Sequence, residues 1–445
     1  MPNVHAFQAV QFGGGVGDVS SRVAPPYDVL SAAQKAAMLQ RDPHNIVAID
    51  LPHTPAKELG PPSAYEAAAR TFDGWLASGA MTRRETPALF AYRQRYTQGT
   101  RTIERTGMAC TIDLVPFGPR PGGGVLPHEE TFSGPKEDRL ALMKATRAQL
   151  SPIFGLHPDE GGQASRLVRS VMTRPADQTA TTPDGVRHEL WTISDAPTIA
   201  AYQAALKGED VFVADGHHRY NTALNYLKHL ESQGGVSADH PARRCMFVLI
   251  SMSDPGLEIW PTHRVLGGMK DYSFDALLAA GSSHLRVEPI AGDLASLERA
   301  VHDLSAMGPI RFGLYDIASK RGCVAIPAFP DPLAKRFADK PAAWRALDVA
   351  VVQHLLVEEI CQPKLNAGQP VTWAFPHTIS EVEDLARGVE TGAGGGKGFA
   401  QLAVILRPTP LSAVRDISRA GVLMPQKSTF FYPKLATGLF VHLVR

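Results

Sequence analysis

The pattern of apolar and polar residues changes most sharply near the middle of the chain. Residues 211–214 form a short apolar run that leads directly into the polar hexapeptide Asp-Gly-His-His-Arg-Tyr at 215–220. Beyond that point apolar residues recur at helical spacing, at Tyr220, Ala223, Leu224 and Leu227. The pattern therefore predicts a buried strand, a tight turn and a helix.

Elsewhere the same pattern predicts helices and strands in mixed order. We expect strands over 7–12, 46–51 and 244–250, a hairpin over 87–97 and 102–114, and helices over 63–77 and 341–361. Ser31 is expected to cap a helix that ends before Pro43. For residues 273–329 the pattern predicts the order helix, strand, helix, strand, strand. These elements predict a mixed α/β fold. We expect four parts: an N-terminal α/β lobe (1–120), a core (121–270), an appended α/β subdomain (271–400) and C-terminal strands that complete the core (401–445).

Composition narrows the class of protein. In 445 residues, 45 Lys and Arg nearly balance 44 Asp and Glu, so there is no basic excess of the kind that drives non-specific nucleic-acid binding. The four cysteines are isolated from one another, which favours a reducing compartment. Neither a signal peptide nor a run of 18 apolar residues is present, so we expect a cytoplasmic protein without a membrane span.

The predicted turn at 215–219 has the residue types of an anion site. The first turn of a helix offers unpaired N–H groups and the positive end of the helix dipole. Gly216 removes a Cβ where an anion must approach, and Arg219 presents a planar fork suited to phosphate or carboxylate. His217 and His218 are able to donate hydrogen bonds or move protons near neutral pH.

A purely structural interpretation of the same residues stays open. Asp215 is able to cap the helix, Gly216 to make the turn, and Arg219 to lie in solvent beside an acidic neighbour. Zinc is disfavoured, because adjacent residues point in different directions and no HExxH or CxxC spacing is present. The glycine-rich tract 391–399 fails as a Walker A loop, and the chain has no GxGxxG or GxSxG motif.

Three further polar segments are candidates for the same site. His128 and Glu129 begin the segment His-Glu-Glu-Thr, and Lys136 and Arg139 lie on one arc of the helix expected to follow it, together with Lys144 and Arg147. Near the C-terminus, Lys427, Ser428 and Lys434 flank an aromatic run and are able to bind phosphate oxygens. A solvated helix face and a plain hairpin loop remain the alternatives.

Six segments together resemble one known family. They are PPYDVLS at Pro25, HEET at His128, KEDRLALMKATRAQLSPIFGL at Lys136, VADGHHRYNTAL at Val213, DPGLEIWPTHR at Asp254 and MPQKSTFFYPKLATGL at Met424. The chain resembles a bacterial and archaeal domain-of-unknown-function family recognised by its DGHHR box and similar to the ParB and sulfiredoxin superfamily. Gln426 departs from the family, in which a second proline is more common before the lysine.

This resemblance implies a ParB/sulfiredoxin-like core with a mixed sheet, and a nucleotide or phosphate cradle at the DGHHR turn. Because the superfamily includes free-serine kinases, it implies phosphotransfer to or from serine, by a kinase or a phosphoserine phosphatase. ATP or ADP would then be the nucleotide, and a phosphorylated small molecule the partner. Without the resemblance, composition and spacing indicate only an anion-binding site with acid–base groups.

Roles follow from the chemistry of phosphoryl transfer, which needs positioning, charge neutralisation and one base. We expect the base or metal ligand among Asp215, Glu129 and Asp28, in that order, with His217 and His218 as further catalytic candidates. Mg²⁺ held by Asp215 or Glu129 is a hypothesis. The expected phosphate- or substrate-binding residues are Gly216, Arg219, His128, Lys136, Arg139, His263, Arg264, Lys427, Ser428 and Lys434.

Two other functions stay open at this point. One is a ParB-like nucleotide-dependent DNA-binding protein, against which the near-zero net charge and the lack of a helix-turn-helix pattern argue. The other is a non-catalytic regulator that binds a phosphorylated metabolite in the same cradle. The sequence indicates no oligomeric state, and a single composite site requires that the separate polar segments meet in space.

Overall fold

Two units make up the chain in a computed structural model that describes residues 2–56, 58–129, 134–303, 310–389 and 393–445. Unit 1 comprises Met1–Pro127, Thr131–Glu258 and Pro433–Arg445, and unit 2 comprises His128–Glu130 and Ile259–Tyr432. Within the described ranges, no helix combines the length and the apolar character that a membrane crossing requires. The four-part division expected from the sequence stays a prediction.

Unit 1 is built on a ten-stranded mixed sheet with the order β3-β10-β11-β5-β6-β13-β9-β12-β7, in which β1 also pairs with β6. The strands are β1 (Val4–His5), β3 (Gly17–Asp18), β5 (Leu89–Gln98), β6 (Arg101–Asp113), β7 (Val125–Leu126), β9 (Ile153–His157), β10 (Gln178–Thr181), β11 (Arg187–Ile193), β12 (Val211–Asp215) and β13 (Arg244–Ser251). β13 is parallel to β9, and β9 is antiparallel to β12. The predicted mixed α/β class is thus confirmed, and the expected hairpin is β5 and β6.

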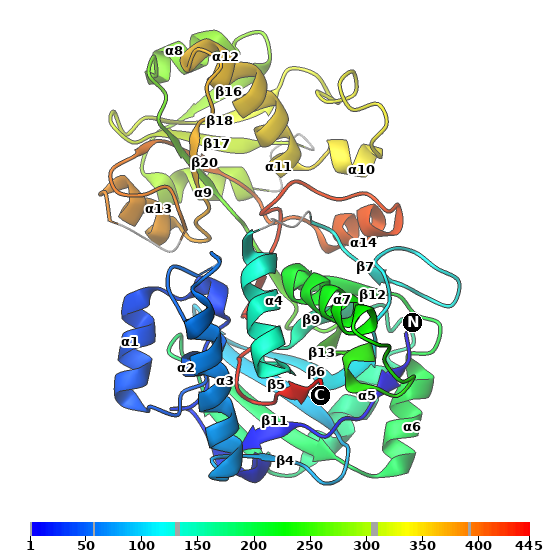
Figure 1. The fold of residues 1–445 in the computed structure, drawn as a ribbon. Helices are drawn as coiled ribbons and strands as arrows, with labels where there is room; N and C mark the ends of the chain where they lie inside the picture. The colour runs from blue at the N-terminus through cyan, green and yellow to red at the C-terminus, as the bar shows by residue number, and fades with distance from the viewer. Residues whose placement is uncertain (1, 57, 130–133, 304–309, 390–392) are drawn as a thin grey trace. The chain divides into compact units, whose positions relative to one another are not determined.

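Helices pack on this sheet through alternate residues of its strands. Those that contribute to its core are α5 (Gln163–Ser170), α6 (Ala196–Ala205) and α7 (His217–Ser232), and unit 1 also contains α1 (Ala32–Arg41), α2 (Val47–Asp50), α3 (Pro62–Ala77) and α4 (Gly134–Thr146). Val168, Tyr202 and Tyr220 share one core with Cys245 and Phe247 of β13, which alternate along that strand. Figure 1 shows α4 and α7 side by side over the sheet.

Shorter elements complete unit 1. β2 (Val10–Phe12) pairs with β4 (Met81–Arg83), and β8 (Ala148–Gln149) pairs with β22 (His442–Leu443) near the C-terminus. Short 3₁₀ turns occupy Gly13–Gly15, Tyr27–Val29, Val171–Thr173 and Pro241–Arg243. The last segment of the chain, 433–445, is therefore part of unit 1 although it follows unit 2 in sequence.

Unit 2 is a six-stranded antiparallel sheet covered on both faces. Its order is β16 (Leu285–Ile290), β18 (Gly322–Pro327), β17 (Phe312–Asp316), β20 (Ala400–Ile405), β15 (Arg264–Gly267) and β19 (Thr372–Ala374). Along β20, Leu402 and Val404 face one core, while Ala403 and Ile405 face another. A separate pair joins β14 (Glu258–Trp260) and β21 (Phe430–Tyr432).

The helices of unit 2 divide between these two cores. α9 (Leu294–His302) and α13 (Ile379–Ala386) pack on the Ala403 side. The other side holds α8 (Phe274–Gly281), α10 (Ala342–Arg345), α11 (Asp348–Val351), a π-helical segment (Val352–Cys361), α12 (Gln362–Leu365) and α14 (Leu411–Arg419). The order α8, β16, α9, β17, β18 confirms the succession predicted for 273–329.

Three predicted elements differ from the structure. Of the strand expected over 7–12, only Val10–Phe12 forms a strand, β2. Within the strand expected over 46–51, Val47–Asp50 forms the short helix α2 instead, because the Asn45 side chain accepts a hydrogen bond from the Val47 N–H at 3.0 Å and so starts a helical turn. The helix expected over 341–361 is interrupted after Arg345 and resumes at Asp348. The helix that begins after Ser31 is confirmed, and Ser31 forms a capping box with Gln34.

Candidate functional site

The junction between β12 and α7 has the predicted strand, turn and helix. β12 ends at Asp215, Gly216 follows with φ +100°, and α7 begins at His217. Gly216 occupies the N-cap position and no side chain caps the helix there. Because Asp215 belongs to the strand and does not cap α7, the capping interpretation of this residue is wrong.

Asp215 is the carboxylate at which two cations meet. Its Oδ1 accepts a hydrogen bond from Lys434 Nζ at 2.8 Å, and its Oδ2 accepts one from Arg219. Burial alone would raise the pKa of Asp215, but Lys434 and Arg219 outweigh burial and hold that pKa well below its ordinary value. Lys434 and Asp215 are 219 positions apart in the chain, and the fold joins them in one ion-pair cluster.

Arg219 contacts the backbone just before β9 and is influenced by the charge of a second carboxylate. Besides Asp215, its guanidinium donates to the Pro152 carbonyl. Burial lowers the pKa of Arg219, and the charges of Asp215 and Asp28 outweigh that effect and raise it. The charge of Asp28 therefore acts on the same cation.

Gly216 is required at this turn for two reasons. Its φ of +100° is one that residues with a side chain rarely adopt. In addition, a Cβ at this position would stand 3.1 Å from the Arg219 guanidinium carbon. The glycine thus keeps the space beside the Arg219 head group open.

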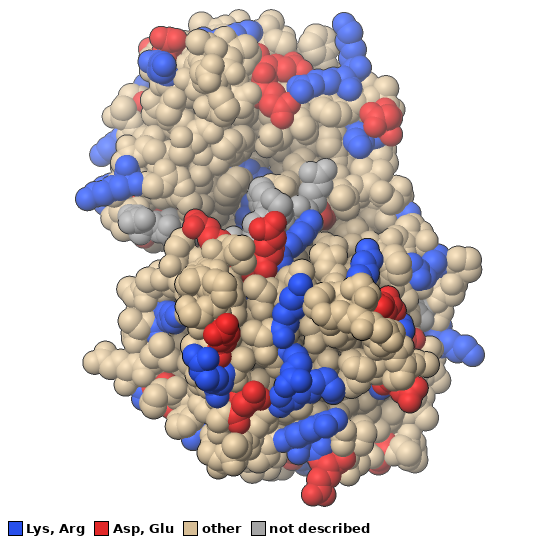
Figure 2. All heavy atoms as spheres, viewed as in Figure 1, with Lys and Arg blue, Asp and Glu red and all other residues tan. Residues whose placement is uncertain are grey.

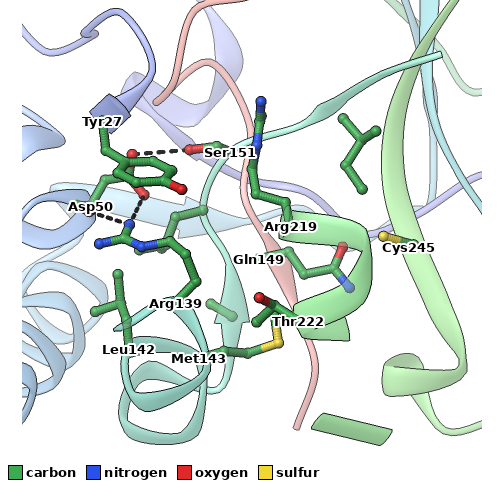
Figure 3. A pocket seen from close by; sticks show the side chains of 13 residues that line it. Tyr27, Asp50, Arg139, Leu142, Met143, Gln149, Ser151, Arg219, Thr222 and Cys245 are labelled. Atoms are coloured by element: carbon green, nitrogen blue, oxygen red, sulfur yellow. Dashed lines mark hydrogen bonds and ion pairs between the residues drawn. The ribbon is translucent and has the colours of Figure 1, made fainter. Parts of the chain in front are cut away.

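A second layer of buried polar groups lies beside Arg219. The Arg139 guanidinium stacks over the Tyr27 ring at 3.9 Å, donates to Asp138 at 2.7 Å and donates to the Asp50 carbonyl at 2.6 Å. Ser151 donates to the Asp50 carboxylate at 3.0 Å, as Figure 3 shows. Burial raises the pKa of Asp50, and Arg139 opposes that rise. The Arg139 guanidinium is thus held by two acidic residues inside unit 1.

These side chains line a small cavity in unit 1. Its wall includes Tyr27, Asp50, Arg139, Ser151 and Arg219, and its volume is about 40 Å³. That volume suits one or two ordered water molecules. Arg219, which also contacts Asp215, therefore lies between this cavity and the ion-pair cluster.

The remaining candidates of unit 1 surround this cluster. His217 is buried, and its charge would help to lower the pKa of Asp215. His218 is half-buried on the first turn of α7, and Lys136 is half-buried on the first turn of α4. Figure 2 shows basic side chains gathered beside α4, where Lys144 is exposed. Arg147 is exposed beyond the end of α4, with φ +51°, and so does not continue the helical arc.

The other candidates lie in unit 2, around the loop at 427–429. Glu129 Oε1 accepts hydrogen bonds from the backbone N–H groups of Ser428 at 2.8 Å and Thr429 at 3.2 Å. His128 Nε2 lies 2.7 Å from the Thr429 hydroxyl. Adjacent N–H groups directed at one carboxylate make an anion-binding loop that the chain's own Glu129 fills. The rest of the predicted segment, Glu130 and Thr131, lies outside the described residues.

Arg264 and His263 support this loop and the core of unit 2. Arg264 donates to the Lys427 carbonyl at 2.9 Å and stacks over the Phe375 ring at 5.0 Å. His263 is fully buried, and its Nδ1 accepts the Leu406 N–H at 3.1 Å. Burial lowers the pKa of His263 to about 3, so this histidine is neutral at pH 7. Ser428 is buried, and its hydroxyl donates to the Pro425 carbonyl.

The predicted site residues thus fall into two sets. Unit 1 holds Asp28, Lys136, Arg139, Asp215, Gly216, His217, His218, Arg219 and Lys434, while unit 2 holds His128, Glu129, His263, Arg264, Lys427 and Ser428. A single cleft made of both sets stays a prediction. Sequence reasoning missed Tyr27, Asp50, Asp138 and Ser151. Tyr27 stands beside Asp28 in a recognised segment, but Asp50 was placed in an expected strand and carried no signal.

The residues proposed for magnesium do not fit that ion. Both carboxylate oxygens of Asp215 contact cationic side chains, and Glu129 Oε1 contacts two backbone N–H groups. Among the residues that the structure describes, no group of three or more His, Cys, Asp or Glu side chains is placed to hold a metal. We therefore assign no step to a metal ion.

Comparison with known proteins identifies the family. Residues 4–350 match the family described as "Protein of unknown function (DUF1015)". The chain belongs to this family. The match includes the β12–α7 junction and most of unit 1, but not Lys434 or the loop at 427–429 of this DUF1015 chain. The sequence has no match among curated proteins.

Several solved structures are distantly similar to this DUF1015 chain. A free serine kinase in complex with AMP has 12% identity and a TM-score of 0.32, covering 71% of this chain and 88% of the other. A conserved hypothetical protein from Pyrococcus furiosus has 14% identity and a TM-score of 0.32, covering 73% and 98%. SbnI from Staphylococcus aureus, with a C-terminal truncation, has 9% identity and a TM-score of 0.32, covering 72% and 84%. Likeness at this level supports no conclusion about activity.

Proposed function

We propose that this protein is a phosphotransfer enzyme that moves a phosphoryl group to or from the hydroxyl of a small amino acid, serine or phosphoserine, with ATP or ADP as the nucleotide. One observation carries the proposal: Arg219 and Lys434, from distant parts of the chain, both contact Asp215 at the uncapped start of α7. The names of the distant free serine kinase structures agree with it but do not support it independently. A ParB/sulfiredoxin-like relationship and a cytoplasmic location belong to the same proposal.

The cluster supplies the charge that phosphoryl transfer demands. Catalysis of this reaction depends mainly on positioning and on neutralising the oxygens of the transferred group. Two cationic side chains and the N–H groups of the first helical turn provide that neutralisation at one place. In the absence of ligand Asp215 balances both cations, and a bound phosphoryl group would compete with its carboxylate for Arg219 and Lys434.

The lowered pKa of Asp215 changes the expected order of candidate bases. A carboxylate held by two cations accepts a proton poorly, so Asp215 is a weak general base. We propose Asp28, a half-buried residue whose charge acts on Arg219, as the base. In the forward direction the serine hydroxyl loses its proton to Asp28 and bonds to phosphorus, while the bond from phosphorus to the nucleotide oxygen breaks and the nucleotide leaves with the electron pair.

The test is a direct assay of both directions. Purified protein is incubated with serine and ATP or ADP, with and without Mg²⁺, and phosphoserine is measured by mass spectrometry; phosphoserine alone is assayed for released phosphate. Arg219→Ala is expected to lower kcat/KM by about 100-fold or more, as loss of a donor to transition-state charge does. Arg166→Ala, at an exposed arginine on α5 of the same unit, is the control. If the wild-type protein neither makes nor consumes phosphoserine, the proposed function is wrong.

A further inference from the structure

A buried arginine lies beneath the Asp215 cluster, at a position that the proposed chemistry does not use. Arg105, on β6, has 1% of its surface exposed. Its guanidinium donates to the Pro433 carbonyl and to Gln94 Oε1, the latter also through Nε at 3.1 Å. Burial lowers the pKa of Arg105 to about 10, so the side chain stays cationic at pH 7.

Gln94 extends this contact to the next residue of the C-terminal segment. Gln94 and Arg105 are direct partners across the β5–β6 hairpin. While its Oε1 accepts from Arg105, its Nε2 donates to the Lys434 carbonyl at 2.8 Å. The carbonyl groups of two successive residues, Pro433 and Lys434, are therefore both held by one buried side-chain pair.

Arg105 also contacts the strand next to Asp215. Its guanidinium carbon lies 4.5 Å from the centre of the Phe154 ring. Phe154, on β9, pairs with Asp215 across the β9–β12 ladder. Arg105 thus supports both partners of the ion pair: Lys434 through the Pro433 carbonyl and Gln94, and Asp215 through Phe154 of the paired strand.

We propose that Arg105 is a positioning residue, which acts through Gln94 and the 433–434 backbone to aim the Lys434 ammonium group at the site of phosphoryl transfer. This proposal rests on the proposed function. It identifies the residues that hold Lys434, one of the two cations of that function, in place. Burying a guanidinium is costly, and a well-packed apolar residue would stabilise a sheet interior at lower cost. The planar fork of arginine suits this place because it donates to two oxygens at once, which an ammonium group on a flexible stem does less well.

The first experiment does not depend on any enzyme activity. The rate of acetylation of Lys434 by acetic anhydride is measured by mass spectrometry in the wild type, Arg105→Met, Arg105→Lys and the control Arg95→Met. Arg95 is a half-buried arginine on β5 whose side chain pairs with Glu104. In the wild type the ion pair with Asp215 slows acetylation of Lys434.

We expect Arg105→Met to raise the acetylation rate of Lys434 by about fivefold, the equivalent of one lost hydrogen bond, and Arg95→Met to leave the rate unchanged. Circular dichroism and thermal unfolding establish that each variant is folded. If Arg105→Met does not fold, the acetylation rate of Lys434 in Arg105→Lys tests the proposal instead, because lysine keeps the positive charge but lacks the planar guanidinium group. An unchanged Lys434 rate in a folded Arg105 variant would overturn the proposal.

The second experiment tests whether Arg105 acts through Lys434. Serine phosphotransfer is measured for Arg105→Met, Lys434→Met and the double variant. If Arg105 acts through Lys434, the double variant loses no more kcat/KM than Lys434→Met alone, and independent roles would give losses that multiply. If the wild type has no phosphotransfer activity, the proposed function fails, while the acetylation rates still decide whether Arg105 positions Lys434.

Discussion

Asp215 is a carboxylate whose ionised form is stabilised by folding. Because its folded pKa lies below the ordinary value near 3.9, it contributes stability that is complete above about pH 5 and is lost as the pH falls through the folded pKa. We predict that Asp215→Asn is less stable than the wild type by about 2 kcal/mol at pH 7, since it leaves two cations without their carboxylate. The difference should shrink at pH 3.

Urea unfolding of both proteins at pH 7 and pH 3 measures this difference. Asp239→Asn, at an exposed carboxylate of the same unit, controls for the change in net charge and should show a small difference at both pH values. An Asp215→Asn difference that stays constant between pH 7 and pH 3 would contradict the ion-pair account, because asparagine does not titrate and the wild-type carboxylate does.

At the scale of single elements, one glycine before β12 and one after it form a matched pair. Gly216 and Gly208 both have positive φ, +100° and +89°, but only at Gly216 would a Cβ meet the Arg219 guanidinium. We predict that alanine at either position costs about 1 kcal/mol of stability from backbone strain. Gly216→Ala should in addition displace Arg219 and weaken ADP binding, measured by calorimetry, while Gly208→Ala should bind ADP as the wild type does. Equal binding by the two variants would show that the space beside Arg219 is not needed.

Elements set by local chemistry could be predicted from the sequence, and those set by distant partners could not. The Ser31 capping box and the hairpin around Gly99 depend on residues a few positions apart, and both are present. Residues 46–51 were predicted wrongly, because a short apolar run fits a strand and a buried helix equally well. In this protein the Asn45 side chain favours the helix. It also donates hydrogen bonds to the Ser21 and Val23 carbonyls, which lie near it only in the folded chain.

The same limit explains the candidate site. Gly216 and Arg219 lie within one turn of Asp215, so spacing alone identified them as parts of an anion site. Lys434 was selected for its chemistry, but its pairing with Asp215 depends on the tertiary fold. Arg105 gave no signal, since an arginine in an alternating strand pattern reads as a solvent-facing residue, and its burial follows from the position of the 433–434 backbone.

At the scale of the whole molecule, unit 1 is discontinuous in sequence. The chain leaves it after Glu258 and returns at Pro433 with the last 13 residues. That final segment carries Lys434, and β22 pairs with β8 in the same unit. Its apolar residues are buried, namely Leu435, Ala436, Leu439, Phe440, Val441, Leu443 and Val444. Unit 1 is therefore complete only when the whole of unit 2 has been synthesised.

We predict that deleting residues 433–445 unfolds unit 1 and leaves unit 2 folded. Burial of each large apolar side chain contributes about 1.5–3 kcal/mol, so the loss of several exceeds the 5–15 kcal/mol of net stability typical of a domain. Unit 2 has two cores made of its own residues, and these do not include the deleted segment. Limited proteolysis with mass spectrometry should show rapid cleavage throughout unit 1 and a resistant fragment within 259–432. Deleting only the exposed Arg445 is the control, since it removes little beyond an exposed ion pair with Asp73. If unit 1 of the truncated protein resists proteolysis as well as unit 1 of the wild type does, the C-terminal segment is not needed for the stability of its core.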